Sequence, residues 1–212
     1  MEKKNYDLVM EEIIKKNLEE GNVFSLLLHT CCAPCSSQTI ARLSSYFHIT
    51  VLYYNPNIEP YEEYLKRKEE QISFLKAYKS KYPISFLDCD WENEKFKEIS
   101  EGLESDKEGG VRCSKCYYLR LEKTASLAKQ LGFDYFTTSL TISPYKDSLL
   151  LNRIGEVLEQ KYQVKYLYSD FKKKDGYKKS IEYSKIYHLY RQDYCGCIYS
   201  KREREKAKNG NS

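Results

Sequence analysis

The 212-residue sequence lacks a long apolar run. A membrane-spanning helix needs about 18 or more consecutive residues that are mostly apolar, and no such segment is present. The opening stretch, MEKKNYDLVMEEIIKKNLEE, is charged throughout and therefore lacks the apolar part of a secretory signal. The sequence also lacks an internal repeat and a low-complexity segment. These absences predict a cytoplasmic protein that makes no membrane contact.

The sequence has little excess charge of either sign. Its 35 basic and 31 acidic residues give a formal net charge of +4, which is too balanced to indicate a nucleic-acid partner. Basic residues gather toward the C-terminus, at 172–174, 178–179 and 201–206. Such clusters suit contacts with phosphates, and an ordinary solvated surface explains them equally well.

Short apolar runs alternate with longer amphipathic stretches along the chain. The runs are rich in β-branched or aromatic residues and are flanked by turn residues, which is typical of buried strands. They cover residues 23–28, 49–54, 84–87, 133–138 and 164–168. The alternation predicts an α/β fold, with a parallel Rossmann-like sheet covered by helices on both faces. We expect one catalytic α/β domain at 23–205, a helical extension at 1–22 and a flexible tail at 206–212.

Two helices can be predicted in more detail. Residues 60–79 carry apolar side chains at helical spacing together with i,i+4 charge pairs, and Pro60 suits the first turn. Asp147 or Ser148 suits the N-cap of another helix. The apolar face expected for this second helix consists of Leu150, Ile154, Val157 and Leu158.

Cysteine is abundant, with eight residues. Cys89 stands alone beside Asp90, and we interpret it as a buried, inert thiol. The others form three compact groups: Cys31, Cys32 and Cys35; Cys113 and Cys116; and Cys195 and Cys197. Because structural disulfides are rare in a reducing compartment, and adjacent cysteines would close only a strained ring, the groups indicate metal binding or catalysis.

The first cysteine group directly follows a predicted strand. Ligand sites of open α/β sheets form beyond the carboxyl ends of the strands, and Pro34 suits the start of the next helix. Backbone amides and the helix dipole at that start favour thiolate over thiol. The same reasoning places the segments after the other strands at one rim: 54–57, 89–90, 138–139 and 143–146.

The number of cysteines is more informative than any single spacing. A closed zinc site takes four ligands, and a 4Fe–4S cluster also takes about four, so thiols remain for a second metal or for redox chemistry. The spacing is not that of a ferredoxin or a zinc ribbon. It is not the CxxxCxxC of radical enzymes either, because Gln38 stands where the third cysteine would be.

Three other readings remain open on the residues alone. A PP-loop ATPase would share the fold class, but Cys, Ala and Pro stand where its first strand should lead into a phosphate loop rich in Gly and Ser. An iron-free thiol–disulfide oxidoreductase would use a CxxC pair without a metal. A zinc-binding protein that interacts with RNA is the non-enzymatic alternative.

Several motifs in this order resemble those of one family, the cobalamin-independent epoxyqueuosine reductases, which complete queuosine at the wobble position of tRNA. The resemblance runs from about residue 25 to about residue 202. Its anchors are LHTCCAPC at 28–35, YYNPNI at 53–58, EGGVRCSKC at 108–116, RL at 120–121, GFD at 132–134, TTSL at 137–140, SPYK at 143–146 and YRQDYCGC at 190–197.

The resemblance implies a fold related to adenine-nucleotide hydrolases and PP-loop proteins. It also implies a 4Fe–4S cluster with an additional iron, held by Cys31, Cys32, Cys35, Cys113, Cys116, Cys195 and Cys197. The implied reaction is a two-electron reduction that removes the epoxide oxygen of epoxyqueuosine in tRNA. Its electrons come from an external low-potential donor of the ferredoxin or flavodoxin type. The sequence does not say which cysteines hold which metal.

Further candidate residues lie on the predicted rim or in the shared motifs. A catalytic role, in particular protonation of the departing oxygen, is expected from Asp90, Tyr145 or Lys146. Contacts with substrate or tRNA are expected from Tyr54, Asn55, Asn57, Arg112, Arg120 and Arg191. Among the arginines, which can pair with phosphates, Arg112 is the strongest candidate because it adjoins Cys113.

Overall fold

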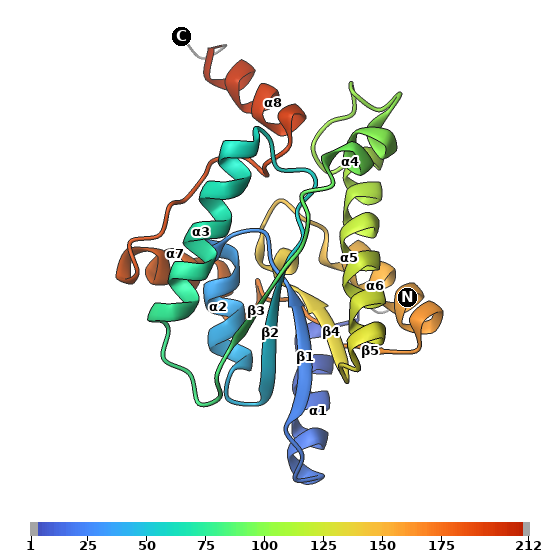
Figure 1. The fold of residues 1–212 in the computed structure, drawn as a ribbon, viewed down its shortest axis with the longest axis vertical. Coiled ribbons are helices and arrows are strands. Elements are labelled where there is room, and N and C mark those ends of the chain that lie inside the picture. The colour runs from blue at the N-terminus through green and yellow to red at the C-terminus, as the bar shows by residue number, and fades with distance from the viewer. Residues whose placement is uncertain (1–3, 210–212) are drawn as a thin grey trace.

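The sheet is the centre of the fold (Figure 1). The structure, a computed structural model, describes residues 4–209 and contains five parallel strands in the order β3-β2-β1-β4-β5. The strands are β1 (Phe24–His29), β2 (Phe47–Tyr53), β3 (Ser85–Asp88), β4 (Tyr135–Thr138) and β5 (Lys165–Tyr166). The order reverses at β1, which lies between β2 and β4. Such a reversal opens a crevice at the carboxyl ends of the two central strands, where α/β proteins bind ligands.

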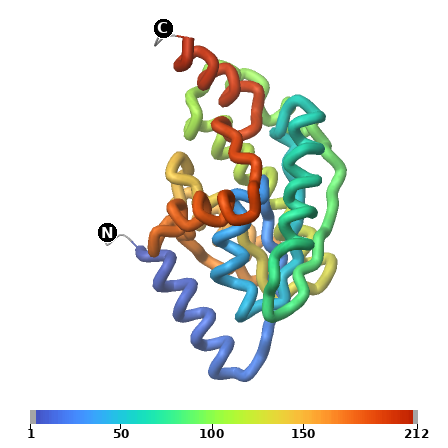
Figure 2. The backbone as a smooth tube through the Cα atoms, turned by 90° about the vertical axis from the view of Figure 1, so that its left-hand side faces the viewer, coloured from blue at the N-terminus to red at the C-terminus, as the bar shows by residue number. Residues whose placement is uncertain are grey.

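Helices cover both faces of the sheet. In chain order they are α1 (Tyr6–Glu19), α2 (Ala33–Leu43), α3 (Tyr61–Ala77), α4 (Asn93–Ser100), α5 (Val111–Leu131), the 3-10 turn η1 (Ser139–Ile142), α6 (Ser148–Tyr162), α7 (Gly176–Ile186) and α8 (Ile198–Asn209). Helices α5 and α6 lie on one face, and α1, α2 and α3 lie on the other. Helix α7 packs on α2, and Figure 2 shows the chain continuing from α7 to α8.

Two apolar cores separate the sheet from its helices, because strand side chains alternate between the faces. Leu27 and Phe136 point into the core beneath α5 and α6, and both are fully buried. Leu26, Leu28 and Val51 point into the opposite core, beneath α2 and α3. The strands are therefore buried on both sides, which is typical of a parallel sheet.

The structure confirms the predicted α/β class, with each expected strand present and its bounds shifted by a few residues. Helix α3 occupies most of the predicted 60–79 segment. Asp147 is the N-cap of α6, and its side chain accepts a hydrogen bond from the Leu149 amide at 2.8 Å. The expected apolar face of α6 was wrong at Val157, which is 55% exposed, because Leu151 is turned into the core instead.

Both terminal helices belong to the described structure. Helix α1 is tied to α2, since Arg42 donates to the Asp7 carboxylate at 2.7 Å and Met10 is 1% exposed. Helix α8 continues to Asn209, so the predicted tail at 206–212 begins within a helix. Residues 1–3 of the expected extension and 210–212 of the expected tail lie outside the described part. Within residues 4–209, no helix is both long enough and apolar enough to cross a membrane.

Candidate metal centre

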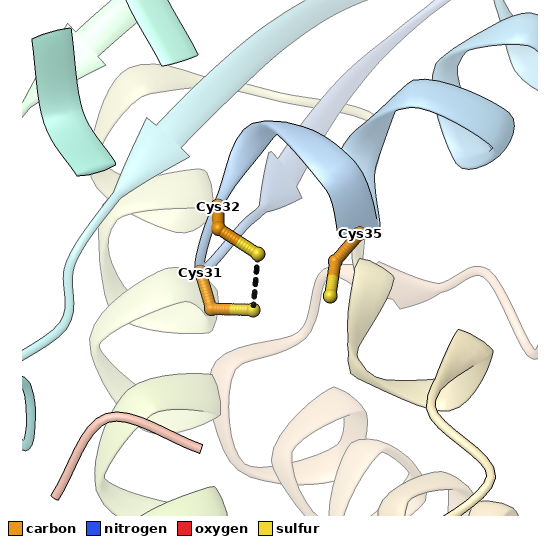
Figure 3. Close-up of side chains that lie close together, drawn as sticks. All are labelled: Cys31, Cys32 and Cys35. Atoms are coloured by element: carbon orange, nitrogen blue, oxygen red, sulfur yellow. Dashed lines mark hydrogen bonds between the residues drawn. The ribbon is translucent and has the colours of Figure 1, made fainter. Parts of the chain in front are cut away.

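The first cysteine group lies at the turn between β1 and α2 (Figure 3). Cys32 is the N-cap of α2 in an extended conformation, and Pro34 occupies the first turn, as the sequence predicted. The Sγ atoms of Cys31 and Cys32 are 3.7 Å apart. With Cys35, one turn further along the helix, all the Sγ atoms lie within 4.8 Å of one another. A set this compact could hold a metal ion.

His29 is the last residue of β1 and hydrogen-bonds to residues at or just after the ends of the neighbouring strands. Its Nδ1 lies 2.9 Å from Thr138 Oγ1 at the end of β4, and its Nε2 lies 3.1 Å from the Tyr54 carbonyl oxygen. Burial, followed by the nearby charge of Arg120, lowers the pKa of His29 to about 3. The imidazole is therefore neutral and serves as a hydrogen-bonding link between the central strands.

The second group lies at the start of α5. Cys113 and Cys116 are one helical turn apart on the same side of the helix, and both are buried. The Gly109 amide donates to Cys113 Sγ at 3.2 Å. Burial raises the pKa of Cys113, and the hydrogen bond from the Gly109 amide opposes that shift.

The third group forms a tight loop before α8. Gly196 lies between Cys195 and Cys197 with φ +131°, a backbone conformation that favours glycine. A Cβ at this position would be 2.9 Å from the Ile58 side chain and 3.1 Å from Arg67 Nη1. Arg67 holds the loop by donating to the Cys195 carbonyl at 3.1 Å. The glycine therefore allows both thiols to approach the same part of the molecule.

The three groups meet at two adjoining pockets. A small pocket of about 330 Å³ is lined by four thiols, those of Cys113, Cys116, Cys195 and Cys197. A larger and more open pocket of about 660 Å³ is lined by Cys31, Cys32, Cys35 and again Cys195. Cys195 therefore connects the pockets, and the convergence that the cysteine count predicted is present.

Burial and mutual contacts set the pKa values of these thiols. Burial raises the pKa of Cys116 to about 12 and that of Cys197 to about 11. Hydrogen bonds from Cys32 and Cys35 hold the pKa of Cys31 well below its usual range, and they raise the pKa values of the two donors. Most of the thiols thus keep their protons in the protein alone. Metal binding would displace those protons.

Three buried arginines surround the thiols. Arg67, Arg112 and Arg120 are each at most 1% exposed. Each has at least one guanidinium nitrogen that lacks a hydrogen-bond partner. These atoms are Nη2 of Arg67, Nε and Nη2 of Arg112, and Nη1 of Arg120. Arg67 is paired with Glu63 at 2.7 Å and Arg112 lies 3.8 Å from Glu203, whereas Arg120 has no carboxylate partner among residues 4–209. A buried cation with unused donors is costly unless an anion compensates it. Although burial alone would lower the pKa of Arg120, interactions with the neighbouring Cys116 and Cys31 raise it, so an anionic, thiolate-bound group fits this donor set.

The sequence comparisons agree with this arrangement. The family model described as epoxyqueuosine reductase QueH matches residues 26–203. The chain belongs to this family. Epoxyqueuosine reductase QueH of Streptococcus pyogenes serotype M1 is 43% identical over 201 residues, covering 94% of this chain and 79% of that protein. The QueH protein of Staphylococcus epidermidis is 40% identical over 203 residues (94% and 85% covered), and that of Thermotoga maritima is 33% identical over 188 residues (86% and 93%). The chain is thus an oxidoreductase of the QueH family.

The structure brings some of the predicted QueH site residues to the pockets. Tyr145, Lys146 and Arg191 line the larger pocket beside the first cysteine group. Asn57 and Arg112 line the small pocket. Tyr145 is 62% exposed at the rim, whereas Lys146 is 8% exposed and lies deeper.

Other predicted residues lie behind the thiols. Asn55 is fully buried, donates to the Thr30 carbonyl at 2.8 Å and accepts from Arg120 at 2.6 Å. Tyr54 is also buried, with its backbone carbonyl facing His29. In this arrangement Tyr54, Asn55 and Arg120 support the site, and contact between them and tRNA stays a prediction.

Two predicted residues have surroundings that differ from those expected. Arg112 was expected to face tRNA phosphates, but its side chain is buried, donates to the Leu103 carbonyl at 2.7 Å and lies over the Tyr199 ring. The loop before α5 holds Arg112 in place, because its backbone amide also donates to the Asp106 carboxylate at 2.9 Å. Asp90 is exposed after β3 and lines neither pocket. The reason is topological, because β3 is the edge strand, distant from the central crevice.

Sequence reasoning missed several residues of the site. Arg67 carries no local signal beyond its i,i+4 spacing from Glu63, one of the charge pairs expected in 60–79. That pair exists at 2.7 Å, yet Arg67 is fully buried. Tyr177 and Arg204 line the larger pocket from α7 and α8. Gly196 could have been identified, because a glycine between two cysteines indicates a special backbone conformation.

Proposed function

We propose that this chain reduces epoxyqueuosine to queuosine at the wobble position of tRNA. Two electrons and two protons enter, both C–O bonds of the epoxide break, the oxygen leaves as water and an alkene remains. One observation supports this reaction above all. Cys195 joins a buried pocket with four thiols to an open pocket with three more, so that an electron-storing group and a substrate would lie side by side.

The cysteine geometry suggests a division between two metals. Cys113, Cys116, Cys195 and Cys197 match the four thiolates that a 4Fe–4S cluster takes, and their pocket is the smaller and less open of the two. The compact first group, Cys31, Cys32 and Cys35, would hold the additional iron at the floor of the open pocket. When bound, these groups supply electrons and a Lewis acid beside the epoxide oxygen.

The chain's own residues would bind the substrate and stabilise charge. Lys146 lines the open pocket, and although burial alone would lower its pKa, interactions with the neighbouring Cys195 and Tyr117 raise it. Its ammonium group is thus suited to hold positive charge near the oxygen as that oxygen becomes negative. Tyr145 lies nearer the solvent and can exchange protons there. Both are better placed than Asp90 for protonating the oxygen.

The proposal includes an external partner and a location. The chain holds no second redox group of its own in this assignment, so electrons must arrive one at a time from a low-potential protein of the ferredoxin or flavodoxin type. The reaction on tRNA and the reducing conditions that free thiols require both suit the cytoplasm.

The test is turnover by the anaerobically reconstituted chain. It is incubated with epoxyqueuosine-containing tRNA and a low-potential reductant, and the digested nucleosides are analysed by mass spectrometry. We expect queuosine to appear with wild type and with the control Cys89→Ala, and to be absent with Cys113→Ala. An intact iron–sulfur cluster without queuosine formation would contradict the proposed function. Zinc in place of iron after anaerobic purification would favour the zinc-binding RNA protein instead.

A further inference from the structure

Two tyrosine–arginine pairs lie at the open pocket. Tyr145 follows η1, and the guanidinium carbon of Arg204 from α8 lies 5.1 Å from the centre of its ring. Tyr177 lies in the first turn of α7, and the guanidinium carbon of Arg191 lies 5.6 Å from its ring centre. All four side chains line the same pocket, although they come from separate segments of the chain.

The two rings differ from most aromatic side chains of the protein. Tyr145 is 62% exposed and Tyr177 is 37% exposed, whereas most other aromatic rings are partly or fully buried. Within residues 4–209, neither ring contacts another aromatic ring. The packing of the core therefore does not account for them, and their surfaces are available to a ligand in the pocket.

The pocket leads from these rings to the thiols. Its lining includes the thiols of the first cysteine group and of Cys195, and Cys31 and Cys32 are buried. A group that enters past Tyr145 and Tyr177 would reach these thiols.

The charges at the pocket suit a polyanion. Among residues 4–209, neither Arg191 nor Arg204 forms an ion pair with a carboxylate. Of the two acidic residues that line the pocket, Asp193 is paired with Lys208 at 2.5 Å, and Glu108 is tied to α8, where its amide donates to the Glu203 carboxylate at 3.2 Å. Arg191 and Arg204 thus retain positive charge beside exposed rings.

We propose that the pairs Tyr145–Arg204 and Tyr177–Arg191 form a clamp that stacks on unpaired bases of the anticodon loop. Unstacked RNA bases commonly bind to aromatic faces and to guanidinium planes. The clamp would hold the extruded wobble nucleotide and a neighbouring base so that the modified side chain points to the thiols. This inference rests on the proposed function and adds the residues that select single-stranded RNA over duplex.

Binding can be measured separately from turnover. The metal-loaded full chain is titrated into a fluorescently labelled hairpin that contains the anticodon stem and loop, and anisotropy gives the dissociation constant. Stacking on one base typically contributes enough that its loss weakens binding roughly 5- to 150-fold. We expect such a loss for Tyr145→Ala and for Tyr177→Ala, but a change within about twofold for Tyr145→Phe and Tyr177→Phe, which retain the ring.

Tyr46 is the matched control. It is 38% exposed, close to Tyr177, and it lies beside the groove between α1 and α2, away from the thiols. Tyr46→Ala should bind the hairpin as wild type does. A blunt duplex with the same stem should bind more weakly than the hairpin and should not distinguish the tyrosine variants from wild type.

The outcomes separate this inference from the proposed function. Wild-type hairpin affinity in both alanine variants would overturn the clamp, even if queuosine forms. Equal losses in the phenylalanine and alanine variants would also overturn it, because they would assign the effect to the hydroxyl group. Ring-dependent hairpin binding without any queuosine formation would support the clamp and contradict the proposed reaction. Ring-dependent binding of duplex and hairpin alike would overturn the selection of unpaired bases.

Discussion

Replacing Arg120 by methionine tests whether the thiols hold an anionic group. Arg120 is 1% exposed, donates to His29 at 3.3 Å and to Asn55 at 2.6 Å, and has no hydrogen-bond partner for Nη1. Within the described residues it has no carboxylate partner. Methionine preserves much of the side-chain volume and removes the charge.

The expected effect depends on whether the metal is bound. In the metal-loaded protein, Arg120→Met leaves buried negative charge uncompensated, and such a loss typically costs about 3–5 kcal/mol. For a chain of this size that corresponds to a decrease in Tm of roughly 6–20 °C. In the metal-free protein most thiols are neutral, so the change removes an uncompensated cation together with two hydrogen bonds, and the loss should be smaller.

The assay is anaerobic thermal unfolding, followed by circular dichroism, of the loaded and metal-free forms. Arg42→Met is the matched control, because Arg42 donates to the buried Asp7 carboxylate at 2.7 Å, and that pair is present whether or not metal is bound. Its decrease in Tm should be the same in both forms. Equal decreases for Arg120→Met in both forms would refute the reasoning.

Further predictions concern glycines and the isolated cysteine. Gly196→Ala should lower the iron and sulfide content after reconstitution. Alanine is strained at a φ of +131°, and its Cβ would be 2.9 Å from the Ile58 side chain, so the cysteine loop would be displaced. Unchanged iron and sulfide content would contradict this. Gly155→Ala should lower the free energy of unfolding, measured in urea, by about 1–3 kcal/mol, because a Cβ there would be 2.3 Å from the Tyr166 ring. A wild-type urea midpoint would contradict this and show that α6 can shift away from the ring. Cys89→Ala should keep wild-type metal content, since Cys89 lines neither pocket, and a loss comparable to that of Cys113→Ala would make it a ligand.

Local sequence patterns predicted the strands and the helix starts, because these depend on neighbouring residues in the chain. The β-branched and aromatic runs predicted the strands, Pro34 predicted the start of α2, and Asp147 predicted the start of α6. Strand order could not be read from these patterns. Treating all strand ends as equivalent therefore placed Asp90 at the central rim, although β3 lies at the sheet edge.

The sequence likewise predicted only part of the candidate site. The cysteine count predicted that the groups converge, because no single group has enough ligands for the metals. The division into a four-thiol and a three-thiol pocket depends on where α5 and the loop at Gly196 lie in space. The arginines illustrate the same point. Residue type suggested phosphate contacts for Arg112 and Arg120, whereas burial beside thiols is a property of the folded chain.

The central claim is that two cysteine sets hold two different metal groups. Iron and acid-labile sulfide analysis of the anaerobically reconstituted protein tests it most directly, with Cys31→Ala and Cys113→Ala compared to wild type. We predict an iron-to-sulfide ratio above one in wild type, a loss of iron with sulfide retained in Cys31→Ala, and a loss of both in Cys113→Ala. A wild-type ratio no greater than one, or loss of both elements in Cys31→Ala, would contradict the assignment.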